Sequence, residues 1–177
     1  MAKAAPEGPI TPQVARYAPP LVKMAGPRTL KPVEKFVPRP TAAFPVKAPV
    51  GYGESGARYG TDRGGRMHEG QDVFAPAGTP LVAMRDSKVV ESGNGGGRGN
   101  YVALYSPSVD RTFVYLHMQS PARVKNGAKV PAGERVGELG CTGSCFGDHL
   151  HLEVRRGKGT TGAPTDPMPH LIRAKRR

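Results

Sequence analysis

The stretch His149-Leu150-His151-Leu152-Glu153 places the strongest constraint on the fold. Polar and apolar residues alternate in it, which is typical of a β-strand because successive side chains point to opposite faces of a sheet. Both imidazoles would then project from one face, a geometry that suits a metal site. Catalytic zinc usually takes three protein ligands, so further ligands must come from elsewhere. Without such partners the same pattern fits an ordinary half-buried strand.

The rest of the chain predicts one antiparallel β domain. Its 177 residues allow one sizeable core plus a tail, and 24 glycines with 19 prolines disfavour a helical bundle. Residues rich in β-branched and aromatic types, bounded by turn residues, predict strands at 80–84, 88–91, 100–105, 111–117 and 135–139. Asp86-Ser87 is expected to be the turn of a hairpin between the first two strands. The only helical candidate is a turn at residues 120–124. The predicted fold class is therefore all-β.

The N-terminal part differs in composition from the rest. Ten of the nineteen prolines lie within residues 1–45, interleaved with single lysines and arginines. Proline removes backbone donors and blocks helices, which predicts an extended state. We expect a Pro-rich basic tail or linker at residues 1–43, a domain at 44–172 and a basic C-terminal tail at 173–177. The tail could anchor the protein to an anionic wall or act as a plain linker.

The formal net charge of +12 predicts attraction to polyanions. Nucleic acid, anionic lipid and a bacterial wall are all polyanionic, so charge alone does not choose among them. Specific nucleic-acid binding is not expected, because the sequence has neither aromatic stacking platforms at recognisable spacing nor a recognition-helix pattern. No apolar run approaches a transmembrane helix, and no secretory signal follows Met1. We expect a soluble monomer without a membrane span.

A second motif supplies candidate metal ligands. His68 and Asp72 are four residues apart, and in an extended segment this even spacing keeps both side chains on one face. Imidazole nitrogen and carboxylate oxygen both suit zinc, so these two residues and one histidine of the later pair would make an open three-ligand site. His117 ends a predicted strand, where a proton-transfer role or a supporting role is conceivable. We assign no role to His170.

Four motifs, taken in order, resemble those of the lysostaphin-type (LytM-like) zinc metallopeptidases, which cut the peptides of bacterial peptidoglycan. They are His68-x-x-x-Asp72, Tyr115-Leu116-His117, Gly140-Cys141-Thr142-Gly143-Ser144 and His149-Leu150-His151-Leu152-Glu153. The resemblance covers roughly residues 44–171. It implies the family fold, an antiparallel sandwich or half-open barrel of the duplicated hybrid motif type. It also implies one Zn2+ per chain held by His68, Asp72 and His151, with His117 and His149 as the catalytic pair.

The same resemblance implies a zinc endopeptidase that hydrolyses peptide cross-links of peptidoglycan through a metal-activated water. Its partner would be bacterial peptidoglycan, and the positive charge also fits other anionic wall polymers. Its place of action would be extracellular or in the cell wall, reached by secretion or by lysis. The alternative is a non-catalytic relative of the same fold that binds peptidoglycan or regulates another hydrolase. Such relatives lack metal ligands, which this chain possesses.

Two features depart from the family pattern. Cys141 and Cys145 stand in the glycine-rich loop where many members carry no cysteine, and they could form a disulfide or a thiolate metal pair. We expect the disulfide, because the resemblance already fills the protein positions of the metal and a wall enzyme works outside the cell. Asp148 replaces a proline that commonly precedes the histidine pair. This change bears on the local backbone and not on the ligand set.

Two glutamates lie beside the candidate ligands. Glu69 invites comparison with the His-Glu-x-x-His metalloproteases, but the second histidine of that motif is absent, so we expect Glu69 to be solvated. Glu153 shares a strand face with His151 and could accept a hydrogen bond from it. The sequence is also compatible with Glu153 as a surface charge.

Overall fold

The computed structural model describes residues 41–176, so the predicted Pro-rich tail at residues 1–43 lies almost wholly outside the described residues. The strands are β1 (Gln71–Phe74), β2 (Pro80–Val82), β3 (Ser87–Gly95), β4 (Gly99–Ser106), β5 (Arg111–Met118), β6 (Lys129–Val130), β7 (Arg135–Glu138), β8 (His149–Arg156) and β9 (Pro164–Thr165). The helices are the two 3-10 turns η1 (Ser55–Ala57) and η2 (Gly96–Arg98) and the α-helix α1 (Met168–Lys175). Among residues 41–176, no helix is long and apolar enough to cross a membrane.

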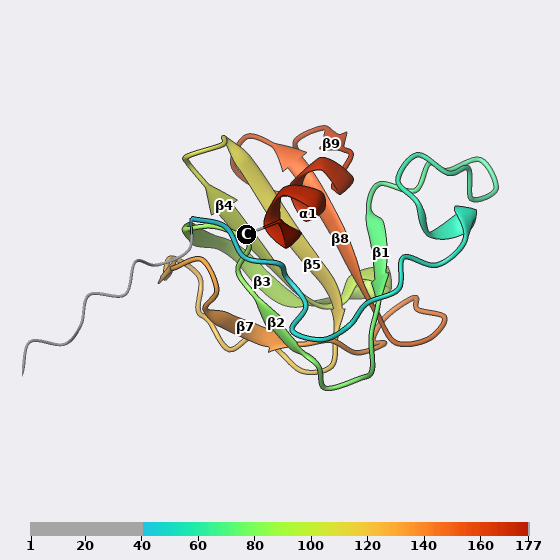
Figure 1. The fold of residues 1–177 in the computed structure, drawn as a ribbon, viewed down its shortest axis with the longest axis horizontal. Coiled ribbons are helices and arrows are strands. Elements are labelled where there is room, and N and C mark those ends of the chain that lie inside the picture. The colour runs from blue at the N-terminus through green and yellow to red at the C-terminus, as the bar shows by residue number, and fades with distance from the viewer. Residues whose placement is uncertain (1–40, 177) are drawn as a thin grey trace, which may run out of the picture. The chain divides into compact units, whose positions relative to one another are not determined.

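The strands form two antiparallel sheets. The large sheet has the order β1-β8-β5-β4-β3-β6, and β9 extends it by pairing with the C-terminal half of β8. β2 and β7 form a separate two-stranded sheet. Figure 1 shows β5 and β8 side by side in the middle of the large sheet, with the segment before β1 forming a lobe beside it. The predicted all-β fold is confirmed, and the sheets do not close into a barrel.

Strand β8 separates the core from the candidate site. Its leucines at 150 and 152 and Val154 enter the main hydrophobic core, while the alternating polar residues face the other side. On that other side a small apolar cluster of Ala103, Val114 and Leu116 covers the sheet. Seven of the eight residues of β8 are therefore buried, and the histidines stand on a rigid strand that is packed on both faces.

Two local predictions were wrong. Asp86-Ser87 does not connect a hairpin, because β2 pairs with β7 in the small sheet and β3 pairs with β4 and β6 in the large one. The segments on either side of Asp86-Ser87 are strands, as predicted, but each pairs with strands other than its neighbour. Residues 120–124 form no helix. The backbone N–H of Arg123 instead donates to the carbonyl of Val136, which holds this segment beside β7.

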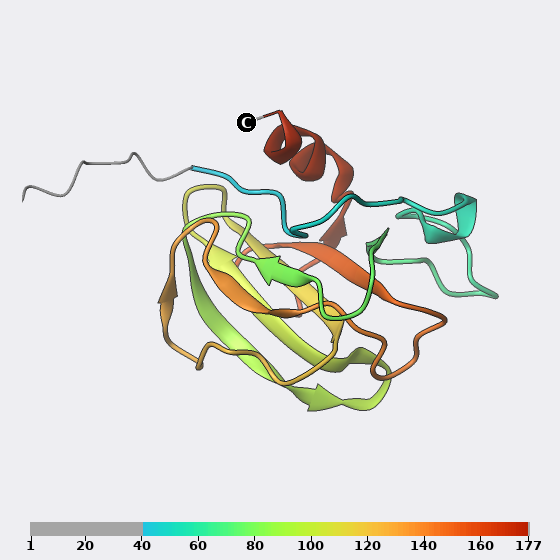
Figure 2. The ribbon, with the colours of Figure 1, turned by 60° about the horizontal axis from the view of Figure 1, so that its bottom comes forward.

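Helix α1 was not predicted. Its second residue is Pro169, a residue that helices tolerate in the first turn, and Leu171 and Ala174 share one buried face. Figure 2 shows α1 outside the large sheet, on the side of the segment that precedes η1. Residues 173–175, which the sequence analysis placed in a C-terminal tail, thus belong to this helix.

Replacing Leu171 tests how α1 is held. Leu171 is fully buried, so Leu171→Ala should lower the free energy of unfolding by about 2–5 kcal/mol through the lost burial and the cavity left behind. Ile172 is 43% exposed in the same helix and is the matched control, with an expected change below about 1 kcal/mol for Ile172→Ala. Denaturant unfolding measures both variants. Equal small losses would contradict the packing of α1 on the core.

Candidate metal centre

The pairing of β1 with β8 creates the centre. The antiparallel register places Asp72 directly opposite His151, and His68 lies just before β1. Nε2 of His68 is 2.9 Å from Nδ1 of His151 and 3.2 Å from Oδ1 of Asp72, and Nδ1 of His151 is 2.8 Å from the same Oδ1. All three residues are buried. The structure thus brings together the three residues that the sequence analysis selected as ligands.

The spacing of these atoms fits one small cation. Bond lengths of about 2.0–2.1 Å in a tetrahedral site put ligand atoms about 3.3 Å apart, close to the spacing in this triangle. Two imidazole nitrogens and one carboxylate oxygen are a donor set that zinc accepts. His68, Asp72 and His151 could therefore hold Zn2+ and leave a fourth position open.

Contacts behind the two histidines, a hydrogen bond for His68 and an ion pair for His151, select the nitrogen that each presents to the centre. The Nδ1 atom of His68 is 2.8 Å from the carbonyl oxygen of Arg58, which can only accept, so Nδ1 carries a proton and, in the neutral ring, Nε2 is the nitrogen that can bind a cation. His151 is oriented the other way, with Nε2 3.4 Å from Oε1 of Glu153 and Nδ1 turned toward Asp72. Both rings are held in the orientation that a metal ligand needs.

Arg63 anchors the carboxylate. Its Nη2 atom donates to Oδ2 of Asp72 at 2.7 Å, which leaves Oδ1 to face the histidines. Burial disfavours the charge on Asp72, but the contacts with His151, His68 and Arg63 outweigh it and hold the pKa of Asp72 well below its usual range. The carboxylate is therefore ionised and oriented.

The outer carboxylates are also paired. Glu153 is buried and accepts a 2.6 Å hydrogen bond from Nε of Arg155, so it is an internal partner of His151 and not a surface charge. Burial opposes the charge on Glu153, but contacts with His151 and Arg155 lower its pKa to about 2. Glu69 is partly exposed, yet it also pairs with Arg155 and is more than a solvated charge. The sequence analysis did not identify Arg63 or Arg155 as part of the site, because the ion pairs that join them to other segments leave no local pattern.

A β-bulge turns His117 toward the centre. Strict alternation after Tyr115 would put Leu116 on the site face and His117 in the core. Leu116 does lie on the site face, but Leu116 and His117 together lie opposite Tyr101 alone, so His117, with a φ of 60°, also reaches the site face. The ring of His117 comes within 5.0 Å of the ring of His149, between centroids. A non-glycine residue in this left-handed region costs about 1–3 kcal/mol, which the surrounding sheet must offset.

His117 and His149 share one arrangement. Nδ1 of His117 donates to the carbonyl of Thr142, and Nδ1 of His149 donates to the carbonyl of Gly147, each at 2.8 Å. In the neutral form of each ring this leaves Nε2 free to accept a proton, and Nε2 of His149 lies 3.6 Å from Oδ1 of Asp72. Burial lowers the pKa of His117 to about 4, so this ring is neutral near pH 7. These two nitrogens can accept or carry a proton beside the centre.

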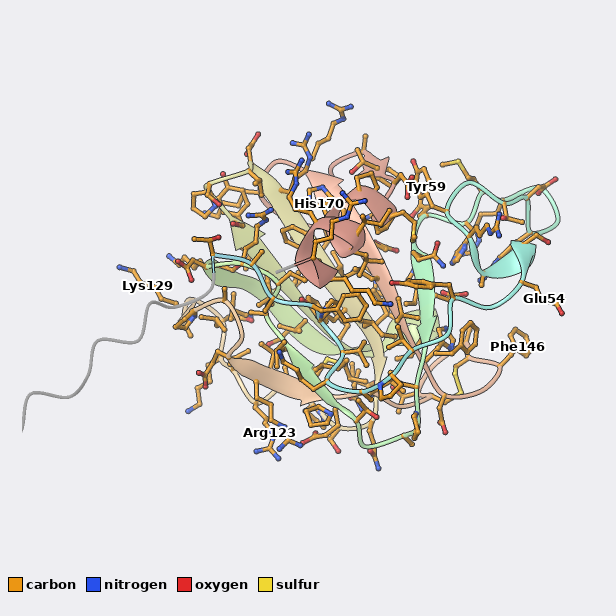
Figure 3. The ribbon with its side chains drawn as sticks, viewed as in Figure 1. Glu54, Tyr59, Arg123, Lys129, Phe146 and His170 are labelled. Atoms are coloured by element: carbon orange, nitrogen blue, oxygen red, sulfur yellow. A yellow bond between two sulfur atoms is a disulfide. The ribbon has the colours of Figure 1, made fainter. Side chains whose placement is uncertain are left out.

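The loop between β7 and β8 supplies the carbonyl partners of both rings. A disulfide joins Cys141 and Cys145 within this loop, as the sequence analysis expected. Gly143, with a φ of 74°, lies so close to the hairpin of β3 and β4 that an added Cβ would come within 2.4 Å of the amide nitrogen of Gly99. Phe146 stands at the tip of the loop, 98% exposed (Figure 3). His170 takes no part, since it packs edge-on against Phe113 on the core side of the sheet.

The centre opens into a cavity of about 350 Å³. His68, His117, His151 and Glu153 lie in its lining, which also includes Arg63, Arg66, Arg98 and Arg155. The arrangement of an open cation site with two oriented imidazole rings beside it suits hydrolysis of a polarised carbonyl compound.

Comparison with known proteins identifies the family. The model of Peptidase family M23 matches residues 66–167 of this chain, a segment that contains the three clustered residues and both further histidines. The chain belongs to peptidase family M23. The match confirms the resemblance to lysostaphin-type peptidases that the four motifs indicated.

Individual relatives share part of their length with this M23 chain. It is 38% identical over 109 residues to the glycyl-glycine endopeptidase ALE-1 of Staphylococcus capitis. This alignment covers 60% of this chain and 30% of the relative. It is 41% identical over 88 residues to the peptidoglycan DD-endopeptidase ShyC of Vibrio cholerae, which covers 50% of this chain and 20% of the relative. The chain thus spans less than a third of the length of these curated relatives.

Solved structures agree with the fold. The catalytic domain of lysostaphin from Staphylococcus simulans is 34% identical with a TM-score of 0.59, over 70% of this chain and 92% of that domain. A zinc containing peptidase from Vibrio cholerae is 26% identical with a TM-score of 0.56, over 73% of this chain and 40% of the other. The M23 chain therefore has zinc-containing homologues with the same β architecture.

Gly70 tests the support of the metal centre. A Cβ at this position would meet Nε2 of His151 at 2.6 Å and the carbonyl oxygen of Leu152 at 2.7 Å, so Gly70→Ala must displace the His151 ring. We expect zinc affinity to fall about tenfold or more, as when outer partners of metal ligands are disturbed. Gly95→Ala is the control, because its Cβ would stand in open space. Competition with a chromophoric chelator measures both, and an unchanged affinity for Gly70→Ala would refute this geometry.

The disulfide is open to a clean test, because the chain has only two cysteines. Reduction should free the loop that holds the imidazoles of His117 and His149 and lower catalytic activity. For so short a loop the chain-entropy model allows at most about 2 kcal/mol of lost stability. Thermal unfolding and activity are measured with and without a thiol reductant, with the Cys141→Ser/Cys145→Ser variant as the control that reductant should not affect. Full activity of that variant would show that the bridge does not hold the loop.

Proposed function

We propose that this chain is a zinc metalloendopeptidase that hydrolyses peptide cross-links of bacterial peptidoglycan. The observation that carries the proposal is the buried cluster of His68, Asp72 and His151, with the rings of two further histidines, each oriented by a backbone carbonyl, beside it. Membership of peptidase family M23 and the endopeptidase activity named for ALE-1 support the reaction class, and the named activity of ShyC supports peptidoglycan as the substrate. Bound zinc would lower the pKa of a water molecule and polarise the scissile carbonyl.

The protein residues would then divide the work. His68, Asp72 and His151 hold the ion, and Arg63 and Glu153 keep two of these ligands oriented. Nε2 of His149 or of His117 accepts the proton of the attacking water, and the protonated ring later gives a proton to the leaving amine. The ring that has taken up this proton can also donate a hydrogen bond through Nε2 to the oxyanion of the tetrahedral intermediate.

The charge and the family also support a place of action. A net charge of +12 favours a protein that works against anionic wall polymers, and a disulfide persists in an oxidising environment. We therefore propose that the chain acts in the cell wall or outside the cell. A non-catalytic wall-binding role is less well supported, since the cluster that could hold the ion is complete.

Incubation with purified peptidoglycans of different cross-bridge types tests the function. New amino termini, identified by mass spectrometry, should appear on at least one wall type and vanish when a chelator is present. Cleavage that persists with the chelator would refute the zinc mechanism. Binding to the wall without any new termini would favour the non-catalytic relative.

Substitution of the two neighbouring histidines separates the proposed roles. His151→Ala should lose zinc and activity together, because it removes a ligand. His149→Ala should keep zinc and lose about 10²-fold or more in kcat, because it removes only proton transfer and transition-state hydrogen bonding. Metal content and kcat are measured on the same samples. A His149→Ala variant with zinc bound and near-full hydrolysis would overturn the assignment.

A further inference from the structure

The cavity over the metal centre carries an excess of positive charge. Four arginines and two glutamates are among its lining residues. One arginine, Arg155, satisfies both glutamates, donating through Nε to Glu153 and through Nη2 to Glu69. Arg63 is held by Asp72 and by the carbonyl of Gly56. Arg66 and Arg98 are left to face whatever occupies the cavity.

Arg66 has no partner of its own. Its side chain is exposed, and within residues 41–176 its guanidinium makes no hydrogen bond or ion pair. Its position is nevertheless defined, because its carbonyl accepts from the amide of Arg63 and the adjacent Met67 bridges to Asp62. The loop therefore presents an unpaired cation at the rim of the cavity.

Arg98 is held by the Tyr101 ring but is only weakly paired with a carboxylate. It ends the η2 turn at the tip of the hairpin of β3 and β4, and its guanidinium lies 5.3 Å from the ring centroid of Tyr101. Its contact with Glu91 is 3.6 Å long, and 38% of each side chain is exposed. Exposed pairs of this kind contribute little, so another carboxylate can compete for the guanidinium. Stacking on Tyr101 restricts the side chain without using its hydrogen-bond donors.

The two arginines flank the reacting centre. Arg66 belongs to the loop before β1, and Arg98 belongs to the turn between β3 and β4. The sheet order places β8 and β5, which carry His151 and His117, between these two elements. Both guanidinium groups line the same cavity, so a carboxylate held there by a peptide that crosses the centre would be attracted by both. A guanidinium group is suited to bidentate binding of a planar carboxylate.

We propose that Arg66 and Arg98 select peptides that carry a free carboxylate beside the cleaved bond. This inference rests on the proposed function and names the substrate class within it. Stem peptides that contain a diamino acid with an unmodified carboxyl group fit this requirement. A bridge made only of glycine has no side-chain carboxylate and does not. General attraction of a basic protein to the wall would be shared by every surface arginine, whereas this selection belongs to two positions.

The test uses two peptides that differ in a single group. One is a D-alanyl-diaminopimelate peptide with a free carboxylate next to the scissile bond, and the other has a carboxamide at that position. Dissociation constants for both are measured by calorimetry on the zinc-loaded full chain, and kcat/KM is measured in parallel. We expect the acid to bind about tenfold more tightly than the amide. Equal binding of the two peptides, or no binding of the acid, would overturn the inference.

Variants locate the selection. Arg66→Gln and Arg98→Gln should each reduce the acid-to-amide preference about threefold, and the double variant should bring it close to one. Arg123→Gln is the matched control, because Arg123 is an exposed arginine outside the cavity lining. Figure 3 shows it well separated from Phe146, which stands at the tip of the loop between β7 and β8. A preference that survives in the double variant, or that Arg123→Gln lowers equally, would refute the role of these residues.

The two proposals fail in different ways. Hydrolysis of neither peptide, with the acid still bound more tightly, would remove the proposed function and leave the carboxylate selection in place. Hydrolysis of both peptides with equal kcat/KM and equal affinity would remove the selection and leave the peptidase.

Discussion

The antiparallel register of β1 on β8 is the constraint on which the candidate centre depends. It sets Asp72 opposite His151 and Phe74 opposite His149, so one strand pairing positions half of the site. A shift of one residue would turn Asp72 to the opposite face, because the side-chain period of a strand is two. The register is protected by burial, since Val73 and Leu152 belong to the main core on the face away from the site. Core packing thus determines the geometry of the polar cluster.

Burying this cluster requires compensation for its charges. A buried carboxylate without a partner is costly, and two of them lie near the centre. Arg63 compensates Asp72 from one side of the site, and Arg155 compensates Glu153 from the other. These ion pairs keep both acids charged and oriented, which a site for a cation requires. The proposed ligands and their outer partners therefore form one electrostatic unit.

The other part of the site, with the rings of His117 and His149, depends on the loop between β7 and β8, which docks against the sheet. Thr142 contributes its carbonyl to His117, while its hydroxyl donates to the carbonyl of Met118 and accepts from the amide of Asn100. The same residue therefore stabilises the bulge and orients the ring that the bulge displaces. The strained backbone of His117 is held by this docking and by the strands on either side.

Much of this protein was determined by the sequence itself. Alternating residues and turn chemistry predicted an antiparallel β domain, and the ordered motifs selected the residues that cluster at the centre. These signals lie in short stretches of the chain, so they can be recognised from the sequence alone. The tertiary structure alone decided which strands pair, that Arg63 and Arg155 support the centre, and that Leu171 and Ala174 join the core. It also decided the direction of His117, because a bulge breaks the alternation on which the local reading relies. These features arise from contacts between segments far apart in the chain, and no local pattern encodes them.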